Sequence, residues 1–127
     1  MLNENIVMTE GSMPYEVRAE VCQIGEDVVI LVSGGEKPHV GAVAVGIPRP
    51  SLEDPDVVSS TASVFALVGH KEDDVAKIIA RKISALLNKN TVVTVGIHVD
   101  NINAEGIKLI QENCNKVVER ILQHYRA

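Results

Sequence analysis

The chain has 127 residues, an apolar share of 46% and a formal net charge of −5. This length suits one domain that buries about two-thirds of the surface of its unfolded chain. The acidic balance argues against a general nucleic-acid binder, which needs a basic face, and one Phe, two Tyr and no Trp offer few platforms for stacking bases. No apolar run approaches the roughly 20 residues of a membrane span. We therefore expect neither a nucleic acid nor a membrane as a partner.

The cysteines and the N-terminal residues predict a cytoplasmic protein. Cys22 and Cys114 lie far apart, with no CxxC and no short cysteine–histidine spacing, so free core thiols are favoured over a disulfide. Residues 1–14 lack the basic and then apolar pattern of a secretory signal. They predict a flexible N-terminal segment, and an edge strand is the other interpretation of this stretch. A single domain is expected over residues 15–127.

The first half of that domain predicts four strands. Residues 15–24 alternate between apolar and polar side chains, which is typical of a strand with one solvated face. Residues 28–32 form an unbroken aliphatic run that suits a more central strand, and a third strand is predicted over residues 40–47. Three prolines in residues 48–58 predict a stiff connection rather than a continued central strand. The fourth strand is predicted over residues 60–68.

Two helices and a fifth strand complete the prediction. The first helix spans residues 71–89, the strand spans residues 91–99, and the last helix is capped by Asn101 or Asn103. The apolar stripes are Val75, Ile79, Ile83 and Leu86 on the first helix, and Ile107, Ile110, Cys114, Val117 and Ile121 on the second. The order β-β-β-β-α-β-α predicts an α+β fold with a roughly five-stranded mixed sheet. Because two helices cannot cover both faces of such a sheet, we expect a homodimer.

Polar residues gather at one edge of this predicted sheet. The first helix has about 19 residues, which is long enough to carry the chain back along the sheet, so the fourth and fifth strands run parallel. His70 then follows one strand, His98 and Asp100 end the other, and an antiparallel third strand starts at His39. Both helices begin at the same edge, where their free N–H groups favour anions. The sequence thus predicts a histidine rim made of His39, His70, His98 and Asp100.

Several chemistries remain open for this rim. Three imidazoles and a carboxylate can hold Zn²⁺, act as general acids and bases, or help to bind a phosphate or carboxylate. The residues come from separate segments, without the short spacing that makes a metal motif specific. Each also has a structural interpretation, as a strand end, a turn, a half-buried imidazole or a helix cap. Arg49 and Ser51, at the opposite end of the third strand, either bind an anion or belong to a stiff solvent loop.

Three blocks of sequence carry a resemblance to a known family. They read PHVGAVAVGIPRPSLEDP, STASVFALVGHKEDDVA and VTVGIHVDNI, and over about residues 15–120 the chain resembles the prenylated flavin chaperones. Those proteins are accessory subunits of the gallate and protocatechuate type of decarboxylase. The resemblance implies a non-catalytic accessory protein that assists prenylated FMN handling and the maturation of a UbiD-like decarboxylase. It also implies a fold similar to that of the dimeric proteasome assembly chaperones.

The resemblance also implies a set of candidate contacts for the cofactor or the partner, with no catalytic residue and no metal ligand among them. These are His39, Arg49, Ser51, His70, Lys71, His98, Asp100 and Asn101. The scarcity of aromatic residues favours transient handling of the flavin over a tight flavoprotein site. The alternatives are a small histidine- or metal-dependent enzyme that acts on an anionic metabolite, and an assembly chaperone that recognises protein surfaces only.

Overall fold

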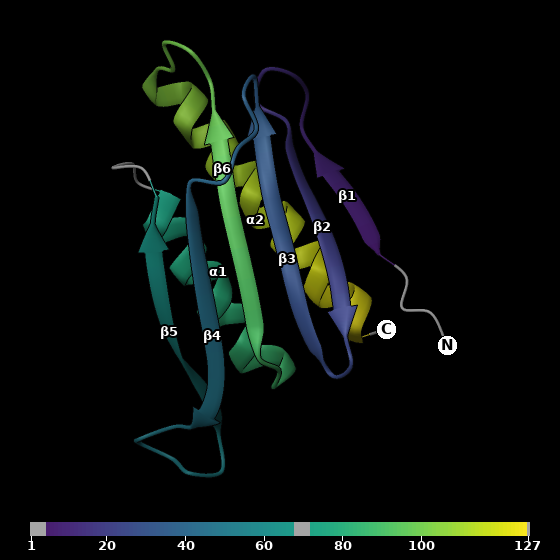
Figure 1. Ribbon diagram of the computed structural model, residues 1–127, viewed down its shortest axis with the longest axis vertical. Coiled ribbons are helices and arrows are strands. Elements are labelled where there is room, and N and C mark those ends of the chain that lie inside the picture. The colour runs from purple at the N-terminus through teal and green to yellow at the C-terminus, as the bar shows by residue number, and fades with distance from the viewer. Residues whose placement is uncertain (1–4, 68–71, 127) are drawn as a thin grey trace.

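The computed structural model describes residues 5–67 and 72–126 and shows one mixed sheet with two helices. The sheet has the strand order β1-β2-β3-β6-β4-β5 (Figure 1). In chain order the elements are β1 (Ile6–Glu10), β2 (Val17–Ile24), β3 (Asp27–Gly35), β4 (Ala42–Pro50), β5 (Val58–Ala66), α1 (Glu72–Leu87), β6 (Thr91–His98) and α2 (Ala104–Arg126). The α+β fold and the mixed sheet are confirmed.

The sheet has six strands in the described chain, and the predicted five is corrected. The additional strand, β1, lies inside the segment that was predicted to be flexible and pairs antiparallel with β2 at the edge of the sheet. Met8 is its one buried residue. One buried side chain in a five-residue strand gives too short an alternation to distinguish an edge strand from an irregular end.

Strand directions agree with the predicted crossover. β3 and β6 pair in parallel, whereas β4 pairs antiparallel with both β5 and β6. β5 and β6 therefore run in the same direction, as predicted, with β4 between them. Consequently β4 begins at the edge of the sheet where β5 and β6 end.

The end of β4 corrects the prediction that its prolines would stop the strand. β4 continues to Pro50, past the predicted end at residue 47, and Pro48 and Pro50 pair with Ser60 and Val58 of β5. Its pairing with β6, however, covers only Ala42–Gly46. Beyond that point one side of β4 has no neighbouring strand, and a residue that lacks an N–H donor is tolerated there.

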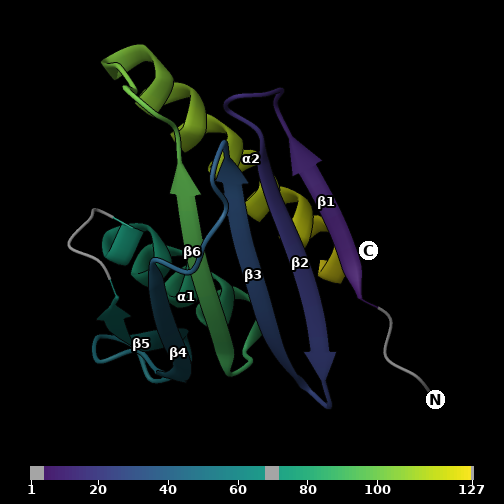
Figure 2. The ribbon, with the colours of Figure 1, turned by 45° about the horizontal axis from the view of Figure 1, so that its top comes forward.

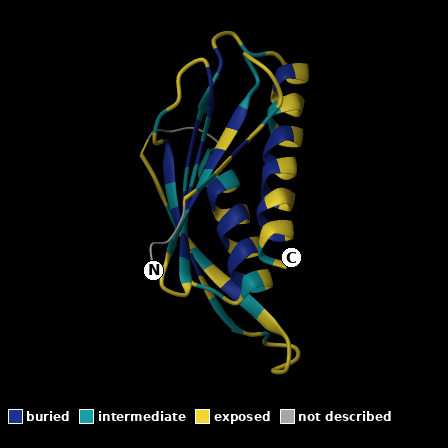
Figure 3. Ribbon diagram, turned by 90° about the vertical axis from the view of Figure 1, so that its right-hand side faces the viewer, coloured by how far each residue is buried: buried dark blue, intermediate teal, exposed yellow. Residues whose placement is uncertain are grey.

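Both helices lie on the same face of the sheet (Figure 3). α1 packs against β4, β5 and β6, and α2 packs against β1 and β2. The predicted stripes are confirmed at their centres, since Ile79, Ile83 and Val117 are buried, but Leu86 is 51% exposed and Ile107 is 46% exposed. The beginning of α2 projects past the end of β6 (Figures 1 and 2), where no strand lies beneath it. In the described chain, neither helix offers the long uncharged stretch that crossing a membrane needs.

The other face of the sheet carries no helix, and we call it the open face (Figure 3). Its centre is aliphatic, and one wing exposes large apolar side chains, with Phe65 73% exposed and Val45 38% exposed. The large apolar strand residues on this face are Val7, Ile24, Val29, Leu31, Val43, Val45, Ile47, Phe65 and Val92. The end formed by β1 and β2 is mixed, since Arg18 and Glu20 form an ion pair there and Val7 and Ile24 are exposed.

Candidate functional site

The connection between β3 and β4 crosses the end of β6, because β6 lies between these two strands in the sheet. Residues 36–41 make this crossing and bond to the backbone of β6 as they pass (Figure 2). The Glu36 N–H donates to the His98 carbonyl at 2.7 Å, and the Gly41 N–H donates to the Val95 carbonyl at 2.9 Å. We call this stretch the crossing segment. It brings the loop after β3, the start of β4 and the end of β6 together.

Two glycines allow the crossing segment to lie so close to β6. Gly35 has a φ of 74°, a left-handed conformation that glycine adopts at little cost. Gly96 lies directly beneath the segment, where an added Cβ would overlap the His39 carbonyl. The backbone of the crossing segment therefore occupies the space that a side chain at position 96 would need.

His39 forms the first of two histidine–carboxylate pairs at this edge. Its Nε2 lies 3.1 Å and 3.2 Å from the two carboxylate oxygens of Glu72, and its Nδ1 lies 2.9 Å from the Lys37 carbonyl oxygen. Both partners are acceptors, so only the doubly protonated imidazolium can donate to both at once. The Glu72 side chain is only 14% exposed and also accepts a hydrogen bond from the Ile97 N–H at 3.2 Å. This pair ties the starts of β4 and α1 to the end of β6.

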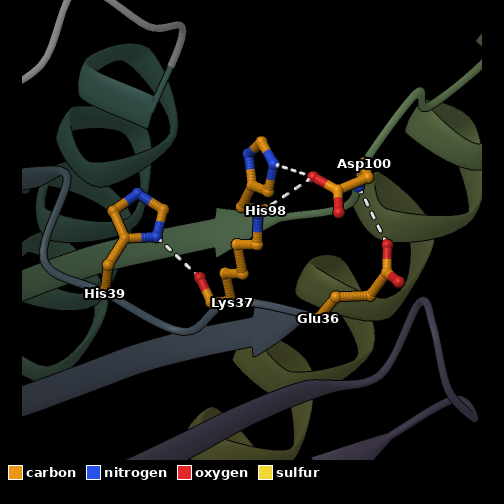
Figure 4. Close-up of polar contacts among 5 residues, drawn as sticks. All are labelled: Glu36, Lys37, His39, His98 and Asp100. Carbon is orange, nitrogen blue, oxygen red and sulfur yellow. Dashed lines mark hydrogen bonds and ion pairs between the residues drawn. The ribbon is translucent and has the colours of Figure 1, made fainter.

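His98 and Asp100 form the second pair (Figure 4). The His98 Nε2 lies 2.9 Å from the Asp100 Oδ1, and the Lys37 Nζ lies 3.3 Å from the same oxygen. The Asp100 N–H donates to the Glu36 carboxylate at 2.9 Å. The hydrogen bond from His98, followed by the hydrogen bond and charge of Lys37, holds the pKa of the Asp100 carboxyl below its ordinary value. Asp100 is therefore charged over the physiological range of pH.

These contacts define what we call the rim cluster: Glu36, Lys37, His39, Glu72, His98 and Asp100. As predicted, His39, His98 and Asp100 lie at one end of the sheet, but each histidine faces its own carboxylate. His70, the fourth predicted member of the rim, and the candidate contact Lys71 lie outside the described residues. Within residues 5–67 and 72–126, no group of three His, Cys, Asp or Glu side chains is placed to hold a metal ion.

Three members of the rim cluster were not predicted from the sequence. Glu72 was visible only as one of three acidic residues in the first turn of a helix, and Glu36 and Lys37 as part of a glycine turn. Of the two predicted helix caps, Asn103 is the one used, because its Oδ1 accepts the Gly106 N–H at 2.8 Å. Asn101 has a φ of 53° and turns the chain between β6 and α2.

Arg49 and Ser51 lie at the opposite end of β4 from the rim cluster, as predicted (Figure 1). The Arg49 Nε donates to the Thr61 hydroxyl at 2.7 Å, and its Nη1 donates to the Pro50 carbonyl at 3.0 Å. The Ser51 hydroxyl accepts the Glu53 N–H at 3.2 Å. Arg49 thus ties the end of β4 to β5, Ser51 stabilises the start of the loop that joins these strands, and the loop exposes Leu52.

A groove of about 750 Å³ runs between α1 and α2 and adjoins the rim cluster. Its lining is mostly aliphatic, from the two helices and from the end of β6. Glu72 and His98 of the rim cluster belong to this lining, and so does Asn101. The groove was not predicted from the sequence. One feature of the sequence could have indicated it: the apolar stripe of the last helix already begins at Ile107, which is 46% exposed and lies before the part of the helix that is buried in the core.

Cys114 lies in the groove lining, and its burial raises the pKa of the thiol to about 11, against an ordinary value of 9.0. Two pH units leave roughly a hundredfold less thiolate at pH 8 than in an unfolded chain. We expect iodoacetamide to alkylate Cys114 at least tenfold more slowly in the native protein than in urea, as measured by mass spectrometry. Equal rates would contradict this. As the pH rises, the thiol of the unfolded chain loses its proton before the thiol of the native protein does. The stability that the protonated Cys114 thiol contributes is therefore present below about pH 9 and is lost as the pH rises towards 11.

Comparison with known proteins places the chain in a family. Residues 11–126 match the family described as the prenylated flavin chaperone LpdD-like domain. The chain belongs to this family. It is also 30% identical over 113 residues to Protein LpdD of Lactiplantibacillus plantarum (strain ATCC BAA-793 / NCIMB 8826 / WCFS1), an alignment that covers 89% of this chain and 79% of that protein.

Family membership confirms the resemblance that the three sequence blocks carried. The matched residues include the whole sheet from β2 onward, both helices, the rim cluster and the groove. A chaperone family fits a non-catalytic protein, and it does not favour the histidine- or metal-dependent enzyme that the sequence left open as an alternative.

Proposed function

We propose that this protein is a non-catalytic accessory protein that handles prenylated FMN and assists the maturation of a UbiD-like decarboxylase. The observation that carries the proposal is the family match, which spans residues 11–126. The rim cluster and the groove support it, since a mostly apolar groove with a few polar groups at one end is typical of small-molecule sites.

The candidate contacts divide between two ends of the molecule in this proposal. His98 and Asn101 line the groove, Asp100 bonds to His98, and His39 bonds to Glu72 of the lining; we assign these four candidates to the cofactor. His70 and Lys71 directly precede Glu72 in the sequence, so we assign them to the same end. Arg49, near the end of β4, and Ser51, in the loop that follows, lie close in sequence to the exposed Leu52, and we assign this end to the partner decarboxylase.

The lining of the groove suits transient handling. In the described chain it contains no Phe, Tyr or Trp, so the imidazole of His98 at its polar end is the one ring on which a flavin could stack. The binding free energy that aliphatic walls provide depends on the apolar area they bury and little on the orientation of the ligand. A protein that must release its cofactor to a second protein benefits from such moderate binding, whereas a flavoenzyme would need a tighter site.

We further propose a cytoplasmic homodimer that forms through the open face. The aliphatic centre of this face and its exposed wing need a cover, and a second copy offers the same surface. Cys22 and Cys114 are both free thiols, which suits a reducing compartment.

Co-expression tests the proposed function. A UbiD-like decarboxylase is produced with a flavin prenyltransferase, in the presence and absence of this protein, and its prenylated FMN content is measured by mass spectrometry. We expect several-fold higher cofactor occupancy and activity when the protein is present. Unchanged occupancy and activity would refute the proposal. If the decarboxylase copurifies with this protein while prenylated FMN shows no measurable binding to it, the protein is an assembly chaperone that recognises protein surfaces only.

A further inference from the structure

The groove between α1 and α2 has walls that are poorly covered in the isolated chain. Ile78 on the α1 side is 64% exposed, and Ile107 on the α2 side is 46% exposed. Between them, the lining includes Val95 of β6 and Val99, which directly follows that strand. A ligand that covers this aliphatic surface removes it from water, which stabilises the complex. The volume, about 750 Å³, lies within the range of sites that enclose a drug-sized molecule.

The charges of the groove exclude one part of a flavin nucleotide. Among the described residues of the lining there is no lysine and no arginine. The carboxylate of the lining, Glu72, already accepts hydrogen bonds from His39 and from the Ile97 N–H. A phosphate inside the groove would face this carboxylate with no lysine or arginine among the described lining residues to compensate its charge, and burying such a charge is costly. An uncharged ring meets no such penalty.

Apart from Glu72 and from His98, which bonds to Asp100, the polar side chains of the described lining are neutral amides. Gln111 and Asn115 lie one turn apart on α2, and Asn101 lies where β6 leads into that helix. A primary amide both donates and accepts hydrogen bonds. The imide edge of a flavin ring presents a carbonyl, an N–H and a second carbonyl, so amides complement it. We propose that the groove binds the uncharged ring system of prenylated FMN, with its apolar isoprenoid addition against the aliphatic walls and its phosphate outside. This inference rests on the proposed function.

Filling the groove tests this assignment. In Ile107→Trp the indole occupies groove space at a position that is half exposed, so the fold tolerates it, and Ile78→Trp does the same from α1. Leu109→Trp is the matched control, because Leu109 is an exposed residue of the same helix outside the groove lining. We expect both groove variants to lower the affinity for prenylated FMN at least tenfold, and Leu109→Trp to bind like the wild type. Phosphatase treatment of the ligand should change the affinity less than either groove variant does.

Cys114 supplies an independent readout from inside the groove. In a Cys22→Ser background, saturating prenylated FMN should slow its alkylation at least fivefold, and inorganic phosphate should not. If the wild type binds prenylated FMN while both groove variants bind it equally well, or Cys114 is not protected, the groove assignment is wrong and the proposed function stands. If the wild type binds no prenylated FMN, both fail. If the groove variants instead lose the decarboxylase with their flavin affinity intact, a polypeptide occupies the groove and the assignment is overturned.

Discussion

Gly96→Ala is expected to destabilise the protein by about 3 kcal/mol or more, which is large for the addition of one methyl group. The new Cβ would overlap the backbone carbonyl of His39, which belongs to the crossing segment. A backbone carbonyl cannot rotate aside as the end of a long side chain can. The crossing segment would have to lift from β6, and its hydrogen bonds from Glu36 and Gly41 to β6 carbonyls would lengthen or break.

Urea unfolding followed by circular dichroism measures this effect. Gly25→Asn is the matched control, because an added Cβ at Gly25 meets nothing within 4 Å and its φ of 60° suits asparagine. We expect Gly25→Asn to shift the midpoint slightly and Gly96→Ala to shift it strongly or to prevent folding. A Gly96→Ala protein as stable as the control would mean that the crossing segment does not rest on β6 in solution.

Local periodicity explains the parts of the fold that could be predicted. Val17, Ala19 and Val21 alternate with polar residues, and all three are buried on one face of β2. The three- and four-residue spacing of Ile79 and Ile83 likewise identified the buried side of α1. One further rule was enough to predict that His39 and His98 lie at the same edge of the sheet: the two strands that a helical crossover connects run parallel.

The contacts that create the site were beyond such reasoning, because they join residues far apart in sequence. Glu72 meets His39 only because β4 starts where α1 starts, and the acidic first turn of a helix is explained equally well by the helix dipole. The position of β6 between β3 and β4 depends on tertiary packing, and it alone makes residues 36–41 a crossing segment. The groove likewise depends on the spacing of two helices, which no local pattern encodes.

Val45→Asp is expected to convert the proposed homodimer into a monomer. Val45 lies on the wing of the open face, next to strand partners Ser63 and Val92, and is 38% exposed in the single chain. In a dimer through this face its side chain would be buried, and an aspartate there would place an unpaired carboxylate in an apolar interface. Such burial costs several kcal/mol, enough to weaken association at least a hundredfold.

Sedimentation velocity at micromolar concentration distinguishes the two states. Leu86→Asp is the control, because it makes the same change of charge at a similarly exposed leucine of α1, on the side of the sheet that faces away from the proposed interface. The wild type and Leu86→Asp should sediment as dimers and Val45→Asp as a monomer. A monomeric wild type, or a dimeric Val45→Asp, would refute a dimer that forms through the open face. Because the groove lies among the helices, on the opposite side from the open face, each copy keeps its own groove. Val45→Asp should therefore bind prenylated FMN as tightly as the wild type, which separates assembly of the dimer from handling of the cofactor.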